Sequence, residues 1–84
     1  MDKKFHIDIL AADKVIYRGE VISLVAPGEL GYLGVLANHA PIIARLTSGR
    51  IILKDTFGKR EIFKSQGSGF LEVVKNRAVI LLDS

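Results

Sequence analysis

The sequence predicts an all-β fold, a sandwich or a barrel, and three observations indicate it. Apolar and polar residues alternate with a period of two, as in FHIDI at residues 5–9. Apolar segments of about four to eight residues are separated by turn residues at regular spacing. No window carries the 3.6-residue period of a helix. A chain of 84 residues is long enough for one domain, residues 1–84, with a single modest core.

The first half of the chain is expected to alternate between strands and glycine-containing turns. Strands are expected at residues 5–9, 15–18, 20–26, 33–36 and 42–46. Gly19 is expected to interrupt the strand structure between residues 15–18 and residues 20–26. Pro27-Gly28 is a turn signal that ends the β-branched run before it.

The second half repeats the pattern with tighter turns. Strands are expected at residues 50–54, 59–64, 70–75 and 78–82. Residues 47–49 (TSG) indicate a turn, and residues 55–58 (DTFG) indicate a hairpin connection. Asn76, together with Lys75 or Arg77, is expected to form a two-residue turn before the last strand.

Two of the expected strands are apolar on both faces. Residues 21–26 (VISLVA) and 78–82 (AVILL) place apolar side chains at successive positions. In a small antiparallel domain one face of a strand normally meets water and carries polar residues. Because 84 residues cannot cover many strands on both sides, we expect a protein partner on an apolar sheet face.

Composition excludes several classes of protein. Apolar residues make up 49% of the chain, which is too many for a disordered segment. No apolar run reaches the roughly 18 residues that span a bilayer, and MDKKFH at the start lacks the apolar stretch of a secretory signal. The absence of cysteine excludes a disulfide framework and a thiolate metal site.

The net charge of +3 is unevenly distributed along the chain. Residues 1–44 carry four Lys/Arg and five Asp/Glu, a charge of −1, whereas residues 45–84 carry eight and four, a charge of +4. Such a basic half is able to attract phosphates or an acidic protein partner. Ordinary strand-edge and turn charges give the same composition, so both interpretations stay open.

The segment of residues 28–41, GELGYLGVLANHAP, contains the most irregular backbone that the sequence predicts. Gly28, Gly31 and Gly34 precede a His-Ala-Pro corner. Glycine beside a strand marks a bulge, a bend or a close backbone approach, so a contact surface or a site is expected here. The spacing matches neither the dinucleotide fingerprint nor the P-loop, and no helix is expected to follow it.

His39 is the first candidate for catalysis because it lies in a turn. No hydroxyl nucleophile motif accompanies it, and a histidine in such a turn more often fixes a loop or an interface. His6 and Asp8 share one strand face and are the only candidates for a weak metal site, but the ordinary polar face of an edge strand is the favoured interpretation. We therefore expect no catalytic residue, no metal and no cofactor.

Nucleic-acid binding is the main alternative function, because small basic β-barrels of the OB type bind single strands through aromatic residues on a basic face. The six aromatic residues are dispersed singly along the chain, at Phe5, Tyr17, Tyr32, Phe57, Phe63 and Phe70. This dispersal disfavours a stacking platform, so no nucleic-acid partner is expected. The alternative interpretation is a small basic β-barrel that binds single-stranded nucleic acid or another protein.

Several segments closely resemble the epsilon subunit of F-type ATP synthase. Residues 33–41, LGVLANHAP, resemble its Leu-Gly-Ile-Leu-x-x-His-Ala-Pro signature. Residues 67–73, GSGFLEV, resemble its Ser-Gly-Gly-Phe-Leu-Glu-Val segment, and residues 46–49, LTSG, fall where the family has Leu-Lys-Pro-Gly. The opening FHIDI and the closing VILLD match as well, so the likeness covers the whole chain in collinear order.

The resemblance implies a fold and a role. It implies a flattened sandwich of two five-stranded, mostly antiparallel sheets. It also implies a non-catalytic rotor subunit in the central stalk, which binds the gamma subunit and the ring of c subunits and helps couple proton flow to ATP synthesis. The expected location is the cytoplasmic face of the bacterial inner membrane, peripheral to the membrane through the complex.

The resemblance also implies which residues make the contacts. On the gamma side the expected residues are His39, Ala40 and Pro41. At the c ring they are Glu29, Leu30, Gly31, Tyr32 and Leu33. On this basis His39→Ala or Gly34→Val is expected to weaken assembly with gamma.

Two departures from the family pattern accompany these expectations. Tyr32 stands where the family commonly has an acidic residue that touches the c ring. The chain ends at Ser84, where typical epsilon subunits continue for about fifty residues as an inhibitory helical hairpin. No helical hairpin, no hairpin-type inhibition and no nucleotide site are therefore expected in this chain.

Overall fold

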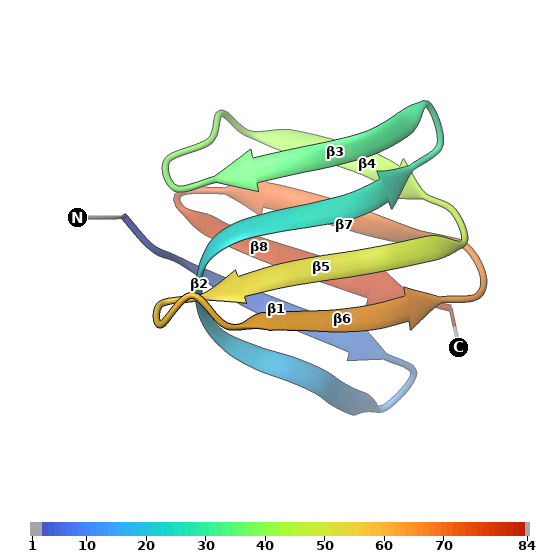
Figure 1. Cartoon of the computed structure of the whole chain (residues 1–84). Helices are drawn as coiled ribbons and strands as arrows, with labels where there is room; N and C mark the ends of the chain where they lie inside the picture. Colours follow the sequence, from blue (N-terminus) through green and yellow to red (C-terminus); the bar gives the residue numbers. More distant parts are fainter. Residues whose placement is uncertain (1–2, 84) are drawn as a thin grey trace.

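A computed structural model of the chain describes residues 3–83 and confirms the predicted all-β fold (Figure 1). Eight strands join in one hydrogen-bonded sheet that folds over into two layers. The strands are β1 (Phe5–Ala11), β2 (Lys14–Gly28), β3 (Gly31–Leu36), β4 (Ile42–Leu46), β5 (Gly49–Asp55), β6 (Arg60–Ser65), β7 (Gly69–Val74) and β8 (Arg77–Leu82).

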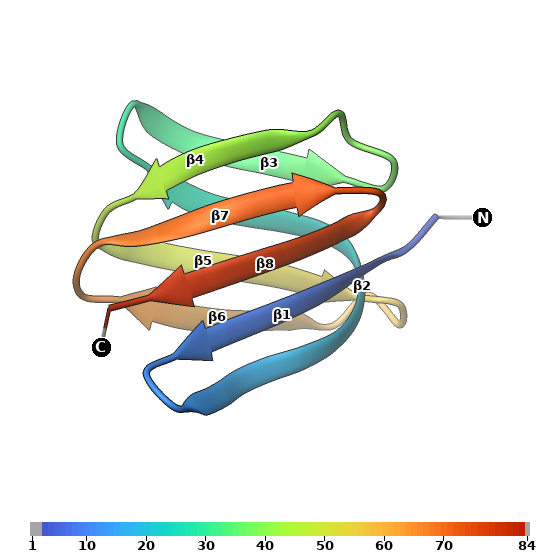
Figure 2. The same cartoon turned by 180° about the vertical axis from the view of Figure 1, so that it is seen from behind.

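The long strand β2 belongs to both layers. Its first part, residues 14–21, pairs with β1, and its second part, residues 23–28, pairs with β3 and β5. One layer therefore runs β4-β7-β8-β1-β2, and we call it the five-strand layer. The other runs β3-β2-β5-β6 and is the four-strand layer. Figure 1 shows the four-strand layer in front, and Figure 2 shows the five-strand layer in front.

This arrangement refines the expected pair of five-stranded sheets. In residues 3–83 the second layer has four strands, and β2 supplies a strand to each layer. All pairings are antiparallel except that of β1 with β8, as the mostly antiparallel prediction requires. The sandwich is closed at one corner by β4, because the Thr47 N–H donates to the Pro27 carbonyl at 2.8 Å and the Glu29 N–H donates to the Arg45 carbonyl at 3.0 Å.

Two turn predictions within β2 were wrong. Gly19 does not interrupt the strand but pairs with Ile7, and a side chain at this position would meet the Tyr17 ring, 3.3 Å from its hydroxyl oxygen. The strand also continues through Pro27 and Gly28, and the chain turns one residue later. Gly28 serves a close backbone approach instead, since a Cβ there would lie 2.7 Å from the Gly31 carbonyl oxygen.

The turns predicted in the second half are confirmed. Lys75 and Asn76 have φ of 51° and 61°, the left-handed pair that a two-residue hairpin turn requires. Between β5 and β6 the Asp55 carboxylate accepts the N–H groups of Phe57 at 2.8 Å and Lys59 at 2.9 Å. Such side-chain-to-backbone bonds are typical of aspartate at the start of a turn.

The core lies between the two layers and consists of their inward-facing apolar residues. The largest fully buried members are Phe5, Ile7, Ile9, Leu24, Leu46, Ile51, Leu53, Leu71 and Ile80. They come from every strand except β3 and β6, which contribute Val35 and the partly buried Phe63. Burying a side chain of this size contributes about 1.5–3 kcal/mol, so the alternating pattern stabilises both layers together.

Candidate functional site

The predicted His-Ala-Pro corner connects β3 to β4 and is held by its own hydrogen bonds. Asn38 adopts a left-handed conformation, φ 63°, and His39 follows it half-buried. The His39 ring donates from Nδ1 to the Ala40 carbonyl at 2.6 Å. This bond uses the imidazole to shape the corner, which is the loop-fixing role expected from the sequence.

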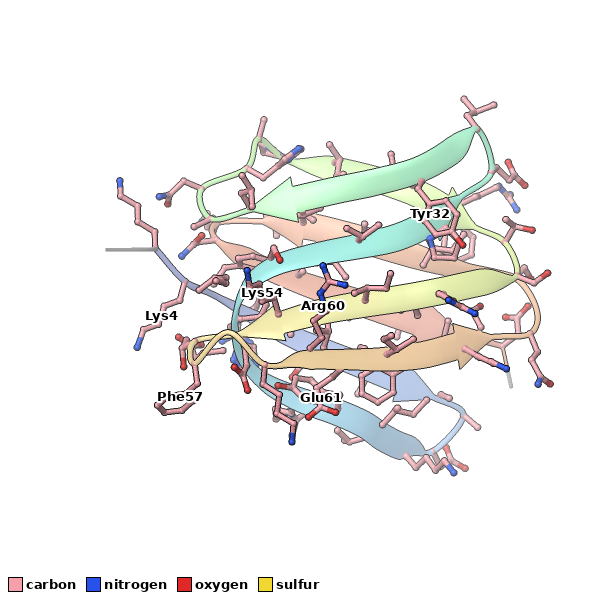
Figure 3. All side chains as sticks on the ribbon, viewed as in Figure 1. Lys4, Tyr32, Lys54, Phe57, Arg60 and Glu61 are labelled. Atoms are coloured by element: carbon pink, nitrogen blue, oxygen red, sulfur yellow. The ribbon has the colours of Figure 1, made fainter. Side chains whose placement is uncertain are left out.

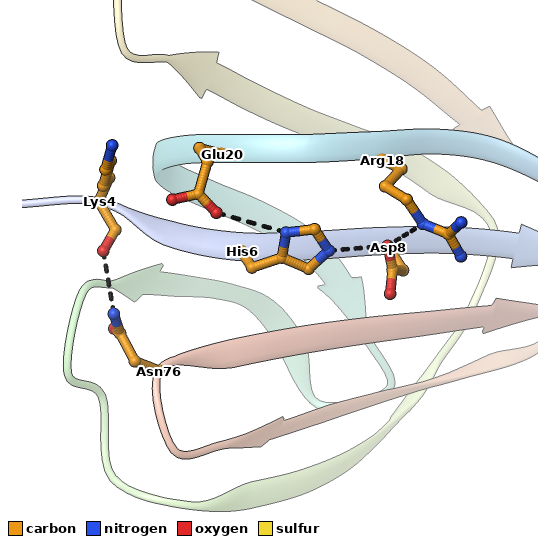
Figure 4. Close-up of polar contacts among 6 residues, drawn as sticks. All are labelled: Lys4, His6, Asp8, Arg18, Glu20 and Asn76. Atoms are coloured by element: carbon orange, nitrogen blue, oxygen red, sulfur yellow. Dashed lines mark hydrogen bonds and ion pairs between the residues drawn. The ribbon is translucent and has the colours of Figure 1, made fainter.

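Asn76 attaches this corner to the five-strand layer. Its side-chain carbonyl accepts the Asn38 N–H at 2.7 Å. Its side-chain amide donates to the Lys4 carbonyl at 3.0 Å, as Figure 4 shows. Its backbone carbonyl also accepts the His6 N–H at 3.3 Å. The sequence indicated Asn76 only as a turn residue, because its three partners are far away along the chain and carry no local signal.

The outer surface of the five-strand layer carries an exposed apolar row. Phe70, Leu81 and Leu10 are paired across β7, β8 and β1, and Val15 continues the row onto β2. Ile43 on β4 is 76% exposed beside this row, and Phe70, Leu81 and Val15 are each between 43% and 50% exposed. We call these five residues the outer apolar face.

The outer apolar face continues toward the loop between β2 and β3. A hollow is lined by residues 28–33, which are the β2–β3 loop and the strand ends beside it, and by Ile43, Ala44 and Arg45 of β4. The Arg45 guanidinium lies over the Phe70 ring, 5.3 Å from its centroid. A cation over an aromatic face contributes about 0.5–1 kcal/mol at an exposed site, so Arg45 orders one edge of the apolar face.

Four charged or polar side chains form a chain of contacts beside this apolar face (Figure 4). The Arg18 Nε–H donates to Asp8 Oδ1 at 2.7 Å. His6 lies between two carboxylates, with Nε2 3.0 Å from Asp8 Oδ1 and Nδ1 3.3 Å from Glu20 Oε2. The hydrogen bond from Arg18 lowers the pKa of Asp8 against the opposing effect of burial, and the hydrogen bond to His6 lowers it further.

These contacts bear on the two interpretations of His6 and Asp8. Strand β1 lies between β2 and β8 and is not an edge strand, so that detail of the polar-face interpretation was wrong. The Arg18 guanidinium bonds to Asp8 Oδ1, the same carboxylate oxygen that lies 3.0 Å from His6 Nε2. No group of three or more His, Asp, Glu or Cys side chains suited to a metal occurs in residues 3–83.

The loop between β2 and β3 presents only part of the segment predicted to contact the c ring. Glu29 and Leu30 form the tip, and Leu30 is fully exposed to solvent. Gly31 follows with φ of 128°, a conformation that favours glycine. Leu33 is half-buried and packs against the core, so it supports the loop from inside.

Tyr32 points away from the tip of this loop. Its ring lies over the outer surface of the four-strand layer, where its hydroxyl accepts the Arg50 N–H at 3.2 Å (Figure 3). Pro27, its cross-strand neighbour, is fully buried. The side chain at this position therefore covers the sheet, whereas Glu29 is the carboxylate at the tip.

The tip and the corner belong to one segment of the sequence but lie at opposite ends of β3 (Figure 1). A strand of six residues separates them by about 20 Å at 3.4 Å per residue. The sequence treated residues 28–41 as one segment, but the structure divides it into two separate exposed regions.

Residues 3–83 contain no helix that is long and apolar enough to cross a bilayer.

Comparison with known proteins gives a consistent family. The family model for the ATP synthase delta/epsilon chain β-sandwich domain matches residues 4–84. The ATP synthase epsilon chain of Dichelobacter nodosus is 40% identical over 99% of this chain, which spans 57% of that relative. The ATP synthase epsilon chain of Chlorobium limicola is 38% identical over 98% of this chain, which spans 92% of it.

Solved structures with the same fold come from mitochondrial complexes. A chain in the Euglena gracilis ATP synthase structure of OSCP, F1 and c ring superposes with a TM-score of 0.89 at 20% identity. It covers 96% of this chain and 51% of its own length. A chain in the Tetrahymena thermophila central stalk and c ring structure gives 0.77 at 13% identity, covering 99% of this chain and 66% of that one. These likenesses concern the fold.

Proposed function

The chain belongs to the ATP synthase delta/epsilon chain family, and from this premise we propose that it is a non-catalytic central-stalk rotor subunit. In this role it links the gamma subunit to the ring of c subunits and helps couple proton translocation to ATP synthesis. The match over residues 4–84 supports the proposal, as does the Chlorobium limicola epsilon chain, which is covered almost completely.

The observation that carries the proposal is the outer apolar face of the five-strand layer. An apolar row of this kind on a small domain marks a protein interface, because burying it removes apolar surface from water. Its position explains why residues 78–82 are apolar at successive positions. Ile80 faces the core and Leu81 faces outward. We assign this face to the gamma subunit.

The corner of His39, Ala40 and Pro41 adjoins the same layer. Asn76 connects it to the turn between β7 and β8, and Pro41 leads directly into β4. This placement supports a gamma contact that begins at the corner and continues over the outer apolar face. His39 acts there by shaping the corner through its bond to Ala40, without a chemical step.

The opposite end of β3 supports the contact with the c ring. Glu29 and Leu30 project at the tip, so a carboxylate is available to polar loops of the ring even though Tyr32 lies over the sheet. Gly31 permits the sharp turn, and Tyr32 and Leu33 hold its base. A carboxylate and a fully exposed leucine side by side offer one polar and one apolar contact.

The proposed location follows from the proposed partners. A subunit that bridges gamma and the c ring lies peripheral to the membrane, bound through the complex. For a bacterial complex this is the cytoplasmic face of the inner membrane.

Cysteine protection tests the assignment directly, because the chain contains no cysteine of its own. Single variants Leu81→Cys and Ile62→Cys place thiols at positions of similar exposure, 50% and 54%, on opposite layers. After mixing with purified gamma subunit, the thiol at position 81 is expected to resist alkylation and the thiol at position 62 to react as in the free chain. Failure to form a gamma complex, or equal reactivity at the two positions, contradicts the proposal.

A further inference from the structure

The outer surface of the four-strand layer concentrates positive charge. The cross-strand pairs Arg50–Lys64 and Lys54–Arg60 join β5 to β6, and all four side chains are exposed. They face outward because they alternate with Ile51 and Leu53, which are buried in the core. Figure 3 shows Lys54 and Arg60 on the front of this layer, toward the viewer.

Within residues 3–83, no carboxylate balances these charges on the same surface. The outward positions of β3, of residues 23–28 of β2, and of β5 and β6 carry no Asp or Glu. Asp55 and Glu61 alternate onto the core side, where they pair with Val21 and Leu53. The pKa of Tyr17 is raised mainly by burial and further by the negative charges of Glu61 and Asp55. This effect is consistent with both carboxylates lying on the core side of the layer.

An apolar row separates the two basic pairs. Gly34, Val25, Ile52 and Ile62 are paired in register across the four strands. Ile62 is 54% exposed, and Val25 and Ile52 are half-buried. The surface therefore has an apolar centre with a basic pair on each side, and we call it the basic face.

We propose that the basic face docks an acidic amphipathic helix of a partner polypeptide, which lies across the strands along the apolar row. Four residues along β5 separate the basic pairs by about 14 Å at 3.4 Å per residue. A helix with its side chains is about 10–12 Å wide, so carboxylates on both of its flanks reach Arg50 and Lys64 on one side and Lys54 and Arg60 on the other.

The length of the row also fits such a helix. Four strands spaced about 4.8 Å apart give a row of roughly 14 Å, which corresponds to about ten residues of helix at 1.5 Å per residue. Single-stranded nucleic acid fits less well, because its binding needs aromatic stacking, and among residues 3–83 Tyr32 is the only aromatic side chain on this face. The inference concerns the layer opposite to the proposed gamma contact and does not depend on that contact.

The probes are two designed amphipathic helical peptides with the same leucine stripe. One has glutamates on both flanks of the stripe, and its twin has lysines. Isothermal titration calorimetry with the 84-residue chain is expected to show binding of the glutamate peptide, weakened by added salt, and none of the lysine peptide. Amide chemical-shift changes in the unmodified chain are expected on β5 and β6 rather than on β7 and β8.

A charge-matched pair of variants makes the test specific. The variant R50Q/K54Q/R60Q/K64Q neutralises the basic face and is expected to lower the affinity for the glutamate peptide roughly tenfold or more. Each exposed ion pair contributes modestly, but four are lost together. The control K4Q/K14Q/K75Q/R77Q removes the same charge elsewhere and is expected to change affinity less than about twofold.

The apolar row is tested separately by Ile62→Ser, which is expected to weaken the peptide roughly fivefold because a half-exposed isoleucine loses its contact. Equal losses in the two charge variants, shifts confined to the five-strand layer, or no effect of Ile62→Ser would overturn the proposal. Tighter binding of a single-stranded oligonucleotide than of the glutamate peptide would overturn it as well.

Discussion

The outer surfaces of the two layers differ in how they use charge. On the five-strand layer, Asp8 is paired with Arg18 and His6 lies between Asp8 and Glu20, beside an apolar row. On the four-strand layer, four basic side chains flank an apolar row, and in the part of the chain that the structure describes no carboxylate lies on the same surface. The two outer surfaces are therefore chemically distinct: one is apolar beside a set of paired charges, and the other is basic with an apolar centre.

Placing a charge on the outer apolar face is expected to give the largest effect. Leu81→Asp leaves a carboxylate in the centre of the proposed gamma interface, where desolvating it without a partner costs about 2 kcal/mol or more. Affinity for gamma, measured by surface plasmon resonance, is expected to fall at least about 30-fold. Ile62→Asp, on the other layer, is the control, and an equal loss there would erase the distinction between the faces.

Asn76 tests whether the His39 corner belongs structurally to the five-strand layer. Asn76→Gly preserves the positive φ of the turn but removes both side-chain bonds, to Asn38 and to Lys4. Stability to urea is expected to fall by about 1–2 kcal/mol, as two bonds of this kind contribute. Hydrogen exchange at the Asn38 amide is expected to accelerate by a larger factor than the fall in the free energy of global unfolding alone would produce.

Lys75→Gly is the matched control, since it relaxes the neighbouring left-handed residue and keeps the asparagine. If this variant accelerates exchange at Asn38 to the same extent, the turn backbone and not the Asn76 side chain holds the corner.

The pH dependence of stability tests the paired charges on the five-strand layer. Because Arg18 lowers the folded-state pKa of Asp8 below its ordinary 3.8, this pair stabilises the fold above about pH 4. That contribution is lost as pH falls below 3.8 and through the lower folded-state value. Asp8→Asn is therefore expected to lower stability at about pH 7 by about 1 kcal/mol, allowing for the exposed guanidinium.

Thermal melts from about pH 2 to about pH 7 measure this effect. The difference between the natural chain and Asp8→Asn is expected to shrink as the pH falls through this window. Glu72→Gln changes a carboxylate on the same layer for which no ion pair is found in residues 3–83, and it serves as the control. A constant difference at all pH values would show that Asp8 stabilises the fold by packing alone.

The local pattern of the sequence was sufficient to predict most of the strands. The strand expected at residues 50–54 is one of them, and its period of two buries Ile51 and Leu53 and exposes Arg50 and Lys54. The turn at Asn76 was equally local. The basic second half of the chain was visible too, but only strand register places four of its charges on one surface.

Features that depend on distant partners were not predictable. Gly19 resembles an interruption locally, yet its pairing with Ile7 keeps it within a strand that crosses between the layers. Tyr32, flanked by Gly31 and Leu33, was grouped with the loop, although its bond to Arg50 holds it on the sheet. The corner and the tip were predicted as one segment because only a short stretch of sequence separates them. The six residues of β3 are extended, so they place the two regions far apart in space.

Gly34→Val is expected to have the smallest effect, because the structure gives no steric reason for the weaker assembly that the sequence predicts. Gly34 lies in the segment that resembles the family signature, which is why valine there was expected to weaken assembly. The structure places Gly34 on the outer surface of the four-strand layer, paired with Val25, and no atom lies within 4 Å of the position that a Cβ would take. Valine is favourable in strands, and the φ of Gly34 is not in the left-handed region.

We therefore expect Gly34→Val to change the free energy of unfolding by less than about 0.5 kcal/mol and to leave gamma affinity unchanged. Because the new side chain lengthens the apolar row on the basic face, it is expected to increase the affinity for the glutamate peptide slightly. Calorimetry with both ligands measures the two effects in one variant. Loss of gamma binding would place the gamma contact on the four-strand layer and exchange the roles of the two faces.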